Sequence, residues 1–541
     1  MAQEYTGREL IERYESLRNN RRTWEDHWQE LADHLIPRKA TITTVRTPGT
    51  KAHTKRFASE PMHALDVLAA NLQGTLTSRS FRWFDLQIAN NDELNKVPAI
   101  RQWLQESSKR MWNAINASNF HSAVHEFYID LTGFGTASIM CEPTPGPKKY
   151  NGLQFVTHPI ESYVFEEDYW GRANACCYIY AWTTRQIRKR FPDFELPEKM
   201  QNAHESNPHE KFPFLHWILP RGDRDPYKVD TKNMEYASCW VDITSAEIVE
   251  ESGYNEMPSM VTRWSRNSGE VYGRGPGNTA LADIKVLNKS TELELNAWAK
   301  FIDPPFFVLD DGVIGKVDLR PGKGTIIRDR DALWFYEFRG RADIGRIKFQ
   351  ELREGIRKTF FADQLELPRS DRMTAEEIRT RVELMQRVLG PTLGRLETEF
   401  LNPLIDRVFG ILERGGALPE APEELVEAFG SSQSIDVKYS GPLARSERMS
   451  EVFSVQRLYE SLAQAAQIDP TVYDIINHEE AARFMADNQD VPETILRSPD
   501  EMEEMRAARS EAQQAQTQQQ QGVEQAQIIE SLARADKLTR E

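Results

Sequence analysis

The sequence predicts a mainly helical α+β fold, and three observations lead to this prediction. Apolar residues three and four positions apart, the spacing of one helix face, fill most of residues 1–131 and most of the chain after residue 279. Strand-like stretches with many turns lie between about residues 137 and 265. Two helical segments of comparable length also flank a run of short strands, which predicts an antiparallel helical stalk with a small β-rich tip.

The composition is that of an ordinary soluble protein with several domains. The chain has 541 residues, of which 40% are hydrophobic and 28% charged. No run approaches the roughly 18 apolar residues of a membrane span, and the start lacks a secretory signal. We therefore expect no membrane partner and a chain that stays in the cytoplasm where it is made. The net charge of −16 argues against a broad basic face that clamps nucleic acid, but an acidic wall would let a duplex slide.

The sequence predicts neither a metal site nor a cofactor. His121 and His125 are four residues apart, as in a helical metal pair, but no third ligand or HExxH motif accompanies them. The cysteines form no CxxC pair and have no histidine at zinc-finger spacing. We interpret all of them as reduced structural thiols: Cys141, Cys176, Cys177 and Cys239.

The N-terminal part of the chain is expected to begin with one long helix. Apolar residues repeat on a single face from Leu10 to Leu35, and Pro37 ends the pattern. Trp24 and Trp28 lie on this face, and we interpret them as packing residues rather than a platform for base stacking. Three further predictions follow along the chain: a helix over 61–77, a strand over 82–88 and a pair of helices over 99–131.

The predicted stalk begins after a glycine-rich stretch. Gly273, Gly275 and Gly277 are not spaced as a phosphate-binding loop, so we interpret them as a flexible entry to a helix. Asn278 or Thr279 would cap this helix, which should run to about Asp303, where two prolines stop it. Its narrow packing stripe suits side-by-side packing in a bundle or ring: Ile284, Leu287, Thr291, Leu295, Trp298 and Ile302.

Short strands are predicted between residues 304 and 342, and a second stalk helix over 343–366. Its apolar side is formed by Ile344, Ile347, Ile356 and Phe360.

A basic turn follows the stalk. It carries Arg369 and Arg372 and leads into a helix start at which Thr374 and Glu377 form a capping box. The helix should reach Arg414, with bends or breaks at Gly390, Pro391 and Pro403. The remaining predictions are a strand over 435–444, a helix over 445–467, a short helical region to about 488, and a helix start capped by Ser498.

Five stretches between about residues 8 and 510 carry a family resemblance. In order, they are "IERYESLRNNR", "YGRGPGNTALADIKVLNK", "RMTAEEIRTR", "YSGPLARSER" and "VPETILRSPDEMEEMRAAR". With a stalk, a β-tip, a basic turn, a kinked helix and a polar tail in this order, the chain resembles the portal (head-to-tail connecting) proteins of short-tailed bacteriophages.

The resemblance implies a portal-type fold. Its domains would be a wing (1–278), a stem helix (279–303), a clip (304–342), a second stem helix (343–366), a channel or tunnel loop (367–373), a long kinked wing helix (374–414), the remaining wing and crown (415–500), and a helical barrel or disordered Gln-rich tail (501–541).

The resemblance also implies a function and partners. About 12 copies would form a ring at one capsid vertex of the virion, through which double-stranded DNA is packaged and ejected. The protein would not be an enzyme and would contact DNA without reading its sequence. The implied partners are the terminase large subunit, the tail adaptor protein, the major capsid and scaffolding proteins, and internal core or ejection proteins.

Candidate site residues follow from this mapping. Lys285, Lys289 and Lys300 on the stem, and Arg369 and Arg372 in the loop, would touch DNA in the channel, with Thr374 and Glu377 holding the loop. The alternative for each lysine is a solvated residue or an inter-subunit salt bridge. Motor or adaptor docking at the clip would use Lys323, Arg328, Trp334 and Arg339.

Two other classes of protein remain as alternatives. A capsid adaptor or scaffold could assemble without passing DNA. A DNA-processing enzyme is less well supported, because an ATPase needs a phosphate loop, which the sequence lacks, and no local spacing marks a nuclease carboxylate cluster.

Overall fold

The computed structural model of the chain describes residues 5–45, 47, 49, 56–80, 82–88, 94–222, 224–225, 228, 230–309, 311–317, 325–331, 333–335, 342–365, 389–429, 442–465, 472, 475–488, 501–502 and 505–509. The chain divides into two compact units. The first contains Met1–Asp85 and Ser108–Pro419, and the second contains Leu86–Ser107 and Glu420–Glu541.

Two helices form the N-terminal segment, α1 (Gly7–Asn20) and α2 (Arg22–Leu35), so the prediction of one continuous helix is wrong. The break lies at Arg21, whose side chain is buried. Its guanidinium donates to the backbone carbonyls of Glu161, at 2.8 Å, and of Tyr163. At the break the backbone of Arg21 leaves helical geometry, with φ −93° and ψ 2°, while its side chain is satisfied by this distant loop.

The helices predicted next in the sequence are confirmed as α3 (Glu60–Leu76), α4 (Pro98–Ala117) and α5 (Phe120–Phe134). The predicted strand over 82–88 is wrong, because this segment contributes no strand to the sheets of the described part. The backbone N–H and C=O of Ile88 instead bond the side-chain amide of Asn95, both at 2.9 Å. Ile88 also forms a single β-bridge, but the alternating buried residues of this segment belong to no strand of the described sheets.

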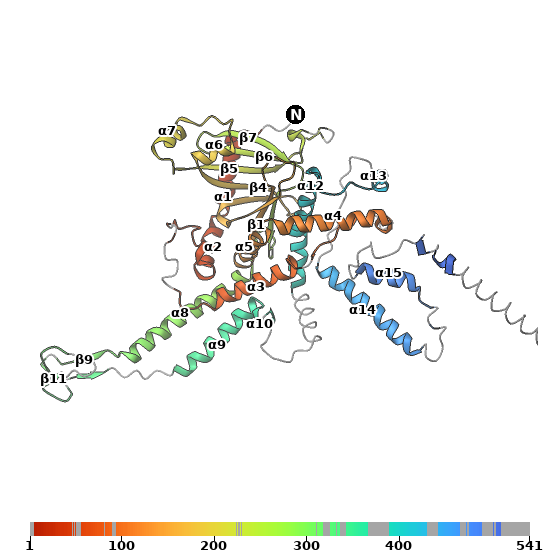
Figure 1. The fold of residues 1–541 in the computed structure, drawn as a ribbon. Coiled ribbons are helices and arrows are strands. Elements are labelled where there is room, and N and C mark those ends of the chain that lie inside the picture. Colours follow the sequence, from red (N-terminus) through yellow and green to blue (C-terminus); the bar gives the residue numbers. More distant parts are fainter. Residues whose placement is uncertain are drawn as a thin grey trace, which may run out of the picture. The chain divides into compact units, whose positions relative to one another are not determined.

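The strand-rich region predicted between 137 and 265 is confirmed as two antiparallel sheets (Figure 1). One has the order β2-β1-β8, with β1 (Thr136–Pro143), β2 (Leu153–His158) and β8 (Ser259–Arg263). The other has the order β3-β4-β5-β6-β7, with β3 (Tyr163–Glu167), β4 (Ala173–Thr183), β5 (Lys211–Pro220), β6 (Tyr236–Asp242) and β7 (Glu247–Tyr254). Short helices connect these strands: η3 (Ile160–Ser162), α6 (Thr184–Arg190), α7 (Glu198–Ser206) and η4 (Thr231–Asn233).

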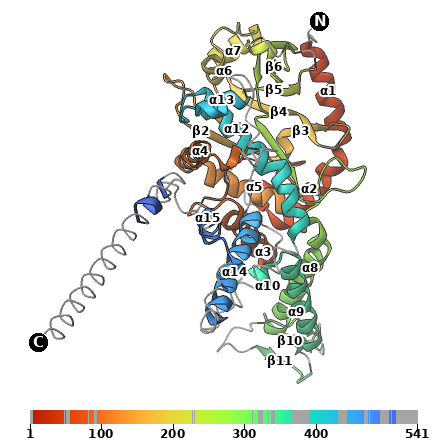
Figure 2. The same ribbon diagram turned by 90° about the vertical axis from the view of Figure 1, so that its right-hand side faces the viewer.

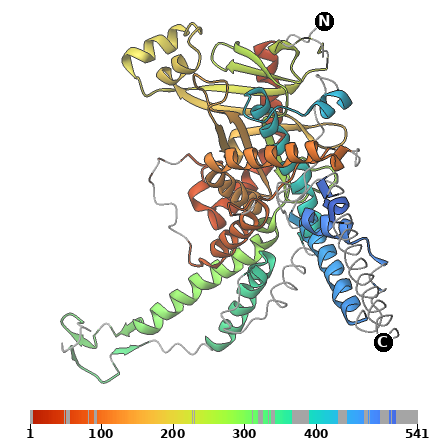
Figure 3. The same ribbon diagram turned by 45° about the vertical axis from the view of Figure 1, so that its right-hand side comes forward.

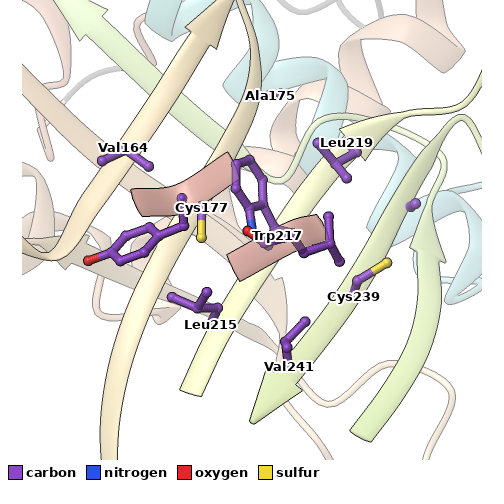
Figure 4. Close-up of a cluster of buried hydrophobic side chains, with 11 residues drawn as sticks. Val164, Ala175, Cys177, Leu215, Trp217, Leu219, Cys239 and Val241 are labelled. Atoms are coloured by element: carbon purple, nitrogen blue, oxygen red, sulfur yellow. The ribbon is translucent and has the colours of Figure 1, made fainter. Parts of the chain in front are cut away.

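Each face of the five-stranded sheet packs its own apolar cluster. Helix α1 runs along one face (Figure 2), where Leu10 and Tyr14 meet the side chains shown in Figure 4. The indole Nε1 of Trp217 donates to the carbonyl of Leu10 at 3.0 Å, so the largest side chain of this cluster is also satisfied. A second cluster packs α6 and α7 against the sheet around Trp240.

The cysteines are free and buried, as the sequence predicts. Burial raises the pKa of the thiols of Cys141, Cys176 and Cys239 to about 12. At neutral pH these thiols are protonated and act as small apolar side chains.

Two buried histidines should make the sheet-containing part of the first unit, here called the body, sensitive to acid. Burial lowers the pKa of His158 to about 4 and that of His216 to about 3. The Nε2 atoms bond the hydroxyls of Tyr180 and Ser238, and the Nδ1 atoms find no partner in the part of the chain that the structure describes. Both rings are therefore neutral in the folded protein at neutral pH.

We expect the free energy of unfolding to fall as pH decreases from 6.5 toward about 4, where the unfolded chain binds more protons than the folded one. Asp130 opposes this, because burial raises its pKa to about 6 despite its ion pair with Lys39. The measurement is the melting temperature between pH 8 and pH 5. The variant His158→Gln should show a shallower decline, and an unchanged pH dependence would contradict this account.

The first stalk helix, α8, spans Pro276–Ile302, so the predicted start at Thr279 and both predicted caps are wrong. The N-cap residue is Gly275. Its backbone N–H donates a hydrogen bond, at 2.7 Å, to Oδ1 of Asn278, which lies in the first turn of the helix. The glycines before and within this start are not a flexible entry. A Cβ at Gly277 would lie 2.3 Å from the carbonyl oxygen of Gly133, and one at Gly273 would lie 2.4 Å from that of Gly135. They let α8 approach the end of α5 backbone to backbone.

The stalk tip contains two short antiparallel strand pairs, which confirms the predicted short strands. One pair is β9 (Phe306–Val308) with β12 (Leu333–Phe335), and the other is β10 (Val313–Ile314) with β11 (Ile326–Ile327). The chain returns in α9 (Ala342–Thr359), which packs against α8 (Figure 3).

The second stalk helix does not run unbroken to residue 366 as predicted. Phe361 has φ +56°, which ends α9, and a separate helix α10 (Ala362–Leu365) follows. The buried Phe360 and Ile356 confirm the expected apolar side in this part of the helix.

The predicted kinked helix is described from residue 389 onward, and its first part, 374–388, lies outside the described residues. Residues 389–396 are α-helical, Glu397–Leu401 form a π-helix, and α12 (Asn402–Arg414) completes the segment. The irregularity therefore lies directly before Pro403. Since the helix is continuous here, proline at 403 removes a donor to the preceding turn, and the carbonyl of Glu399 accepts a hydrogen bond from Thr262 Oγ1 at 3.4 Å.

The second unit contains α13 (Glu423–Phe429), α14 (Pro442–Ala465) and α15 (His478–Asn488), which confirms the helices predicted over 445–467 and to about 488. The predicted strand over 435–444 is wrong at its end, because residues 442–444 begin α14, and 435–441 lie outside the described residues. So do the Ser498 cap and residues 510–541 of the tail. The remaining short helices of the chain are η1 (Pro37–Lys39) and η2 (Leu94–Lys96).

Candidate functional site

The stalk is anchored on the body by the first half of α8. Ile284 and Leu287 of the predicted stripe are buried. The side-chain oxygen of Asn288 accepts a hydrogen bond from the backbone N–H of Phe57 at 2.7 Å. This half of the helix thus behaves as part of the folded core.

The second half of α8 is apolar but exposed. Four of its side chains, here called the stalk apolar surface, keep between 46% and 77% of their accessible area: Leu295, Trp298, Phe301 and Ile302. Leu293 is also exposed, but at about 100° per residue it lies on the side of Lys289 and Lys300. Trp298 and Phe301 contact each other edge to face, with ring centroids 6.2 Å apart. The predicted stripe is therefore covered only near the body, and its outer half needs another surface to cover it.

Exposed apolar side chains continue onto the tip. They include Phe306, Phe307, Leu309, Ile314, Ile326 and Trp334. Trp334, one of the predicted docking residues, stacks on Phe307 with centroids 5.6 Å apart and the rings inclined by 26°. Large aromatic side chains that are half exposed and mutually packed are typical of protein contact surfaces.

The predicted channel lysines share one face of α8. At about 100° per residue, Lys285, Lys289 and Lys300 fall within about 60° of one another and opposite Trp298 and Ile302. Lys285 pairs with Glu30, and Lys289 Nζ lies 2.9 Å from Glu292 Oε2. Lys300 is exposed and forms no ion pair within the described ranges.

The other candidate residues are only partly described. Arg328 Nη1 lies 2.8 Å from Asp311 Oδ1 on the tip, and both side chains are exposed. Lys323, Arg339, Arg369, Arg372, Thr374 and Glu377 lie outside the described residues. Their roles stay predictions.

The predicted histidine pair is engaged within the protein. His121 Nε2 lies 2.6 Å from Asn116 Oδ1, and His125 Nδ1 lies 3.0 Å from Gln73 Oε1. In the part of the chain described here, no group of three or more His, Cys, Asp and Glu side chains is placed to hold a metal ion. No helix among the described residues is both long enough and apolar enough to cross a bilayer.

A buried charge network beside the π-helix is not indicated by any local sequence pattern. Arg263, at the end of β8, is 1% exposed. Its Nη2 lies 2.7 Å from Glu399 Oε1 in the π-helix, and its Nη1 pairs with Glu167 at the end of β3. The partners lie 96 and 136 residues away along the chain, so no local spacing could reveal them.

An uncovered apolar surface on a stalk that extends from a mixed helix–sheet body is typical of a subunit of a larger assembly. The chain belongs to the family of bacteriophage head to tail connecting proteins, whose profile matches residues 7–496. This membership gives the protein the role of a portal, or head-to-tail connector, of a phage. It confirms the resemblance inferred from the sequence.

Curated relatives match between 78% and 95% of the chain. The probable portal protein of Bordetella phage BPP-1 is 28% identical over 536 residues, covering 95% of this chain and 93% of the relative. The portal protein of Salmonella phage epsilon15 is 25% identical over 519 residues, covering 94% and 91%. The portal protein of Escherichia phage T7 is 22% identical over 461 residues, covering 78% and 79%.

Proposed function

We propose that the protein assembles into a closed ring of about 12 copies at one capsid vertex and that double-stranded DNA enters and leaves through the axis of this ring. The terminase motor, and later the tail adaptor, would dock at the stalk tip. Capsid and scaffolding proteins, with internal core or ejection proteins, would surround the body.

The observation that carries this proposal is the stalk apolar surface. Its four large apolar side chains, all in half of one helix, remain exposed in the single chain. A soluble protein rarely leaves such a surface uncovered, and a neighbouring copy in a ring would cover it. In that arrangement α8 and α9 are the stem, residues 304–342 the clip and 367–373 the channel loop, while the wing and crown are formed by residues 1–278 and 374–500.

The three lysines on one face of α8 support the proposal that the stem lines a DNA channel. If the apolar side of each stem packs against neighbouring copies, the opposite side, with Lys285, Lys289 and Lys300, is left for the axis. Rotational symmetry would repeat each lysine as a ring of positive charge that contacts phosphate without reading sequence. The chain as a whole is acidic, with a net charge of −16, and this would keep the duplex from sticking.

Replacing Trp298 and Phe301 together with glutamine should weaken assembly. Each side chain would lose apolar burial against a neighbouring copy, so we expect the concentration needed for assembly to rise about tenfold or more. Mass photometry of wild type and variant measures this. Because both residues are exposed in the single chain, the melting temperature of the monomer should change little.

Val45→Gln is the matched control, since Val45 is fully exposed on a loop. It should assemble as the wild type does. Unchanged assembly of the Trp298/Phe301 variant would show that the stalk apolar surface does not lie between copies.

Replacing Arg369 and Arg372 with glutamate should leave ring assembly intact and reduce DNA packaging. Repulsion between the new carboxylates and phosphate is the physical reason. An in vitro packaging assay with purified rings measures the effect. Loss of the ring itself would instead show that these residues are structural.

A further inference from the structure

The turn between β3 and β4 presents two aromatic side chains to solvent. Tyr169 is 90% exposed and Trp170 71% exposed, with ring centroids 5.1 Å apart. The turn itself is fixed, because Asp168 Oδ1 accepts hydrogen bonds from the backbone N–H groups of Trp170, at 2.9 Å, and Arg172, at 2.8 Å. The aromatic pair is thus held on a rigid support.

Two arginine side chains donate hydrogen bonds to the backbone of this turn. The carbonyl oxygen of Gly171 accepts hydrogen bonds from Arg263 Nη2, at 2.8 Å, and from Arg266 Nη1, at 3.4 Å. Holding the turn in this way lowers the entropy that it would lose on binding a partner.

Beside the turn lies a cavity of about 920 Å³, with walls formed by the turn, β8 and residues 391–406. Trp170, Arg172, Arg266 and Arg395 line it. Arg266 Nε and Arg395 Nη1 are buried and have no hydrogen-bond partner in the described part of the chain. Buried donors without acceptors are costly, so they favour a ligand that supplies oxygen atoms.

In the described part of the molecule, two arginine side chains at the cavity are left without an ion-pair partner. Glu256 pairs with Arg407 and Arg414, Glu399 pairs with Arg263, and Glu235 pairs with Arg224. Among the described residues, by contrast, the guanidinium groups of Arg172 and Arg395 have no ion-pair partner. Asp406 lines the cavity as well, so its lining holds four arginines and four carboxylates, and the unpaired guanidinium groups of Arg172 and Arg395 are the donors open to an incoming carboxylate.

We propose that Tyr169, Trp170, Arg172 and Arg395, here called the turn surface, form a lateral docking surface for a carboxylate-bearing segment of a second copy of this chain. The inference rests on the ring proposed above, whose heterologous contacts join two different surfaces of each subunit. Tyr, Trp and Arg are the side chains that dominate interface energies. Copies that each carry a net charge of −16 repel one another and have carboxylates in excess, so unpaired arginines are complementary to them.

Duplex DNA fits this surface less well. The cavity is concave, and Glu235, Glu256 and Asp406 also line it. A rigid duplex would bring several phosphates toward these carboxylates, whereas one side-chain carboxylate can reach the arginines alone.

The first test is the double variant Arg172→Glu/Arg395→Glu of the full chain. We expect the concentration for assembly to rise about tenfold or more, with an unchanged melting temperature of the monomer. The matched control is Arg185→Glu/Arg188→Glu on α6, which changes net charge equally at exposed arginines that form no ion pair within the described ranges. This control should assemble as the wild type does.

The second test needs no substitution. Hydroxyl-radical footprinting of wild-type monomer and ring should show Tyr169 and Trp170 oxidised in the monomer and protected in the ring. Continued oxidation in the ring would overturn the inference, as would normal assembly of the Arg172/Arg395 variant. Normal assembly with weakened binding of a short DNA duplex would overturn it in favour of a phosphate site. A wild type that forms no ring at all would instead contradict the proposed function, which keeps the two failures distinct.

Discussion

Replacing Arg263 with methionine should lower the free energy of unfolding of the body by about 3–5 kcal/mol, because the partly buried carboxylate of Glu399 loses its partner and that of Glu167 keeps only Arg266. The guanidinium joins Glu399 in the π-helix to Glu167 on β3, and the backbone N–H of Arg263 also donates to Glu399 Oε2 at 2.9 Å. This network is the charged connection between β8 and the segment that leads into α12. Urea unfolding, followed by circular dichroism, measures the loss.

The matched control is Arg8→Met. Arg8 and Glu12 form an exposed ion pair at 3.3 Å on α1, which should contribute no more than about 0.5 kcal/mol. Arg263→Lys should give an intermediate result, because an ammonium group cannot bond two carboxylates in the planar geometry of a guanidinium. Equal stability of Arg263→Met and Arg8→Met would show that the network does not stabilise the fold.

Replacing Gly277 with alanine should also be strongly destabilising, by about 1–3 kcal/mol or more. In an isolated helix this change would be favourable by up to about 1 kcal/mol. Here the added Cβ would lie 2.3 Å from the carbonyl oxygen of Gly133, and a backbone atom cannot move aside as a side chain can. The start of α8 would have to separate from the end of α5, so the stalk would lose its seat on the body.

Gly355→Ala in α9 is the control for this prediction. A Cβ at Gly355 meets nothing within 4 Å, so the intrinsic preference for alanine should leave stability equal or slightly higher. A Gly277→Ala protein as stable as the wild type would contradict the close approach of α8 to α5. A side chain at Gly135 should be still more destabilising, because the φ of +84° at this residue also disfavours any side chain.

Most helices of the fold could be predicted from the sequence because their signals are local. Apolar spacing and helix-end signals are properties of a short segment, so local patterns predict α3, α5 and α12. The errors lie where a distant contact decides. The first helix divides at Arg21, whose carbonyl acceptors lie about 140 residues away, and the backbone of Ile88 bonds the side chain of Asn95.

The sequence predicts which residues of the candidate site share a helix face, but not which of them the rest of the protein covers. Spacing places Leu295, Trp298 and Ile302 on one face of α8, yet only the structure shows that the body covers Ile284 and leaves the outer residues exposed. The turn surface could not be predicted, since its cavity joins the β3–β4 turn to residues more than 200 positions later. Local sequence patterns carry no record of such long-range neighbours.

Electron cryomicroscopy of the purified full-length protein tests the central claim most directly. The account predicts closed rings with the α8–α9 stalks around an axial opening wide enough for a DNA duplex, the face with Lys285, Lys289 and Lys300 toward the axis, and the stalk apolar surface between copies. Particles without an axial opening, or rings with Trp298 and Phe301 facing solvent, would contradict it.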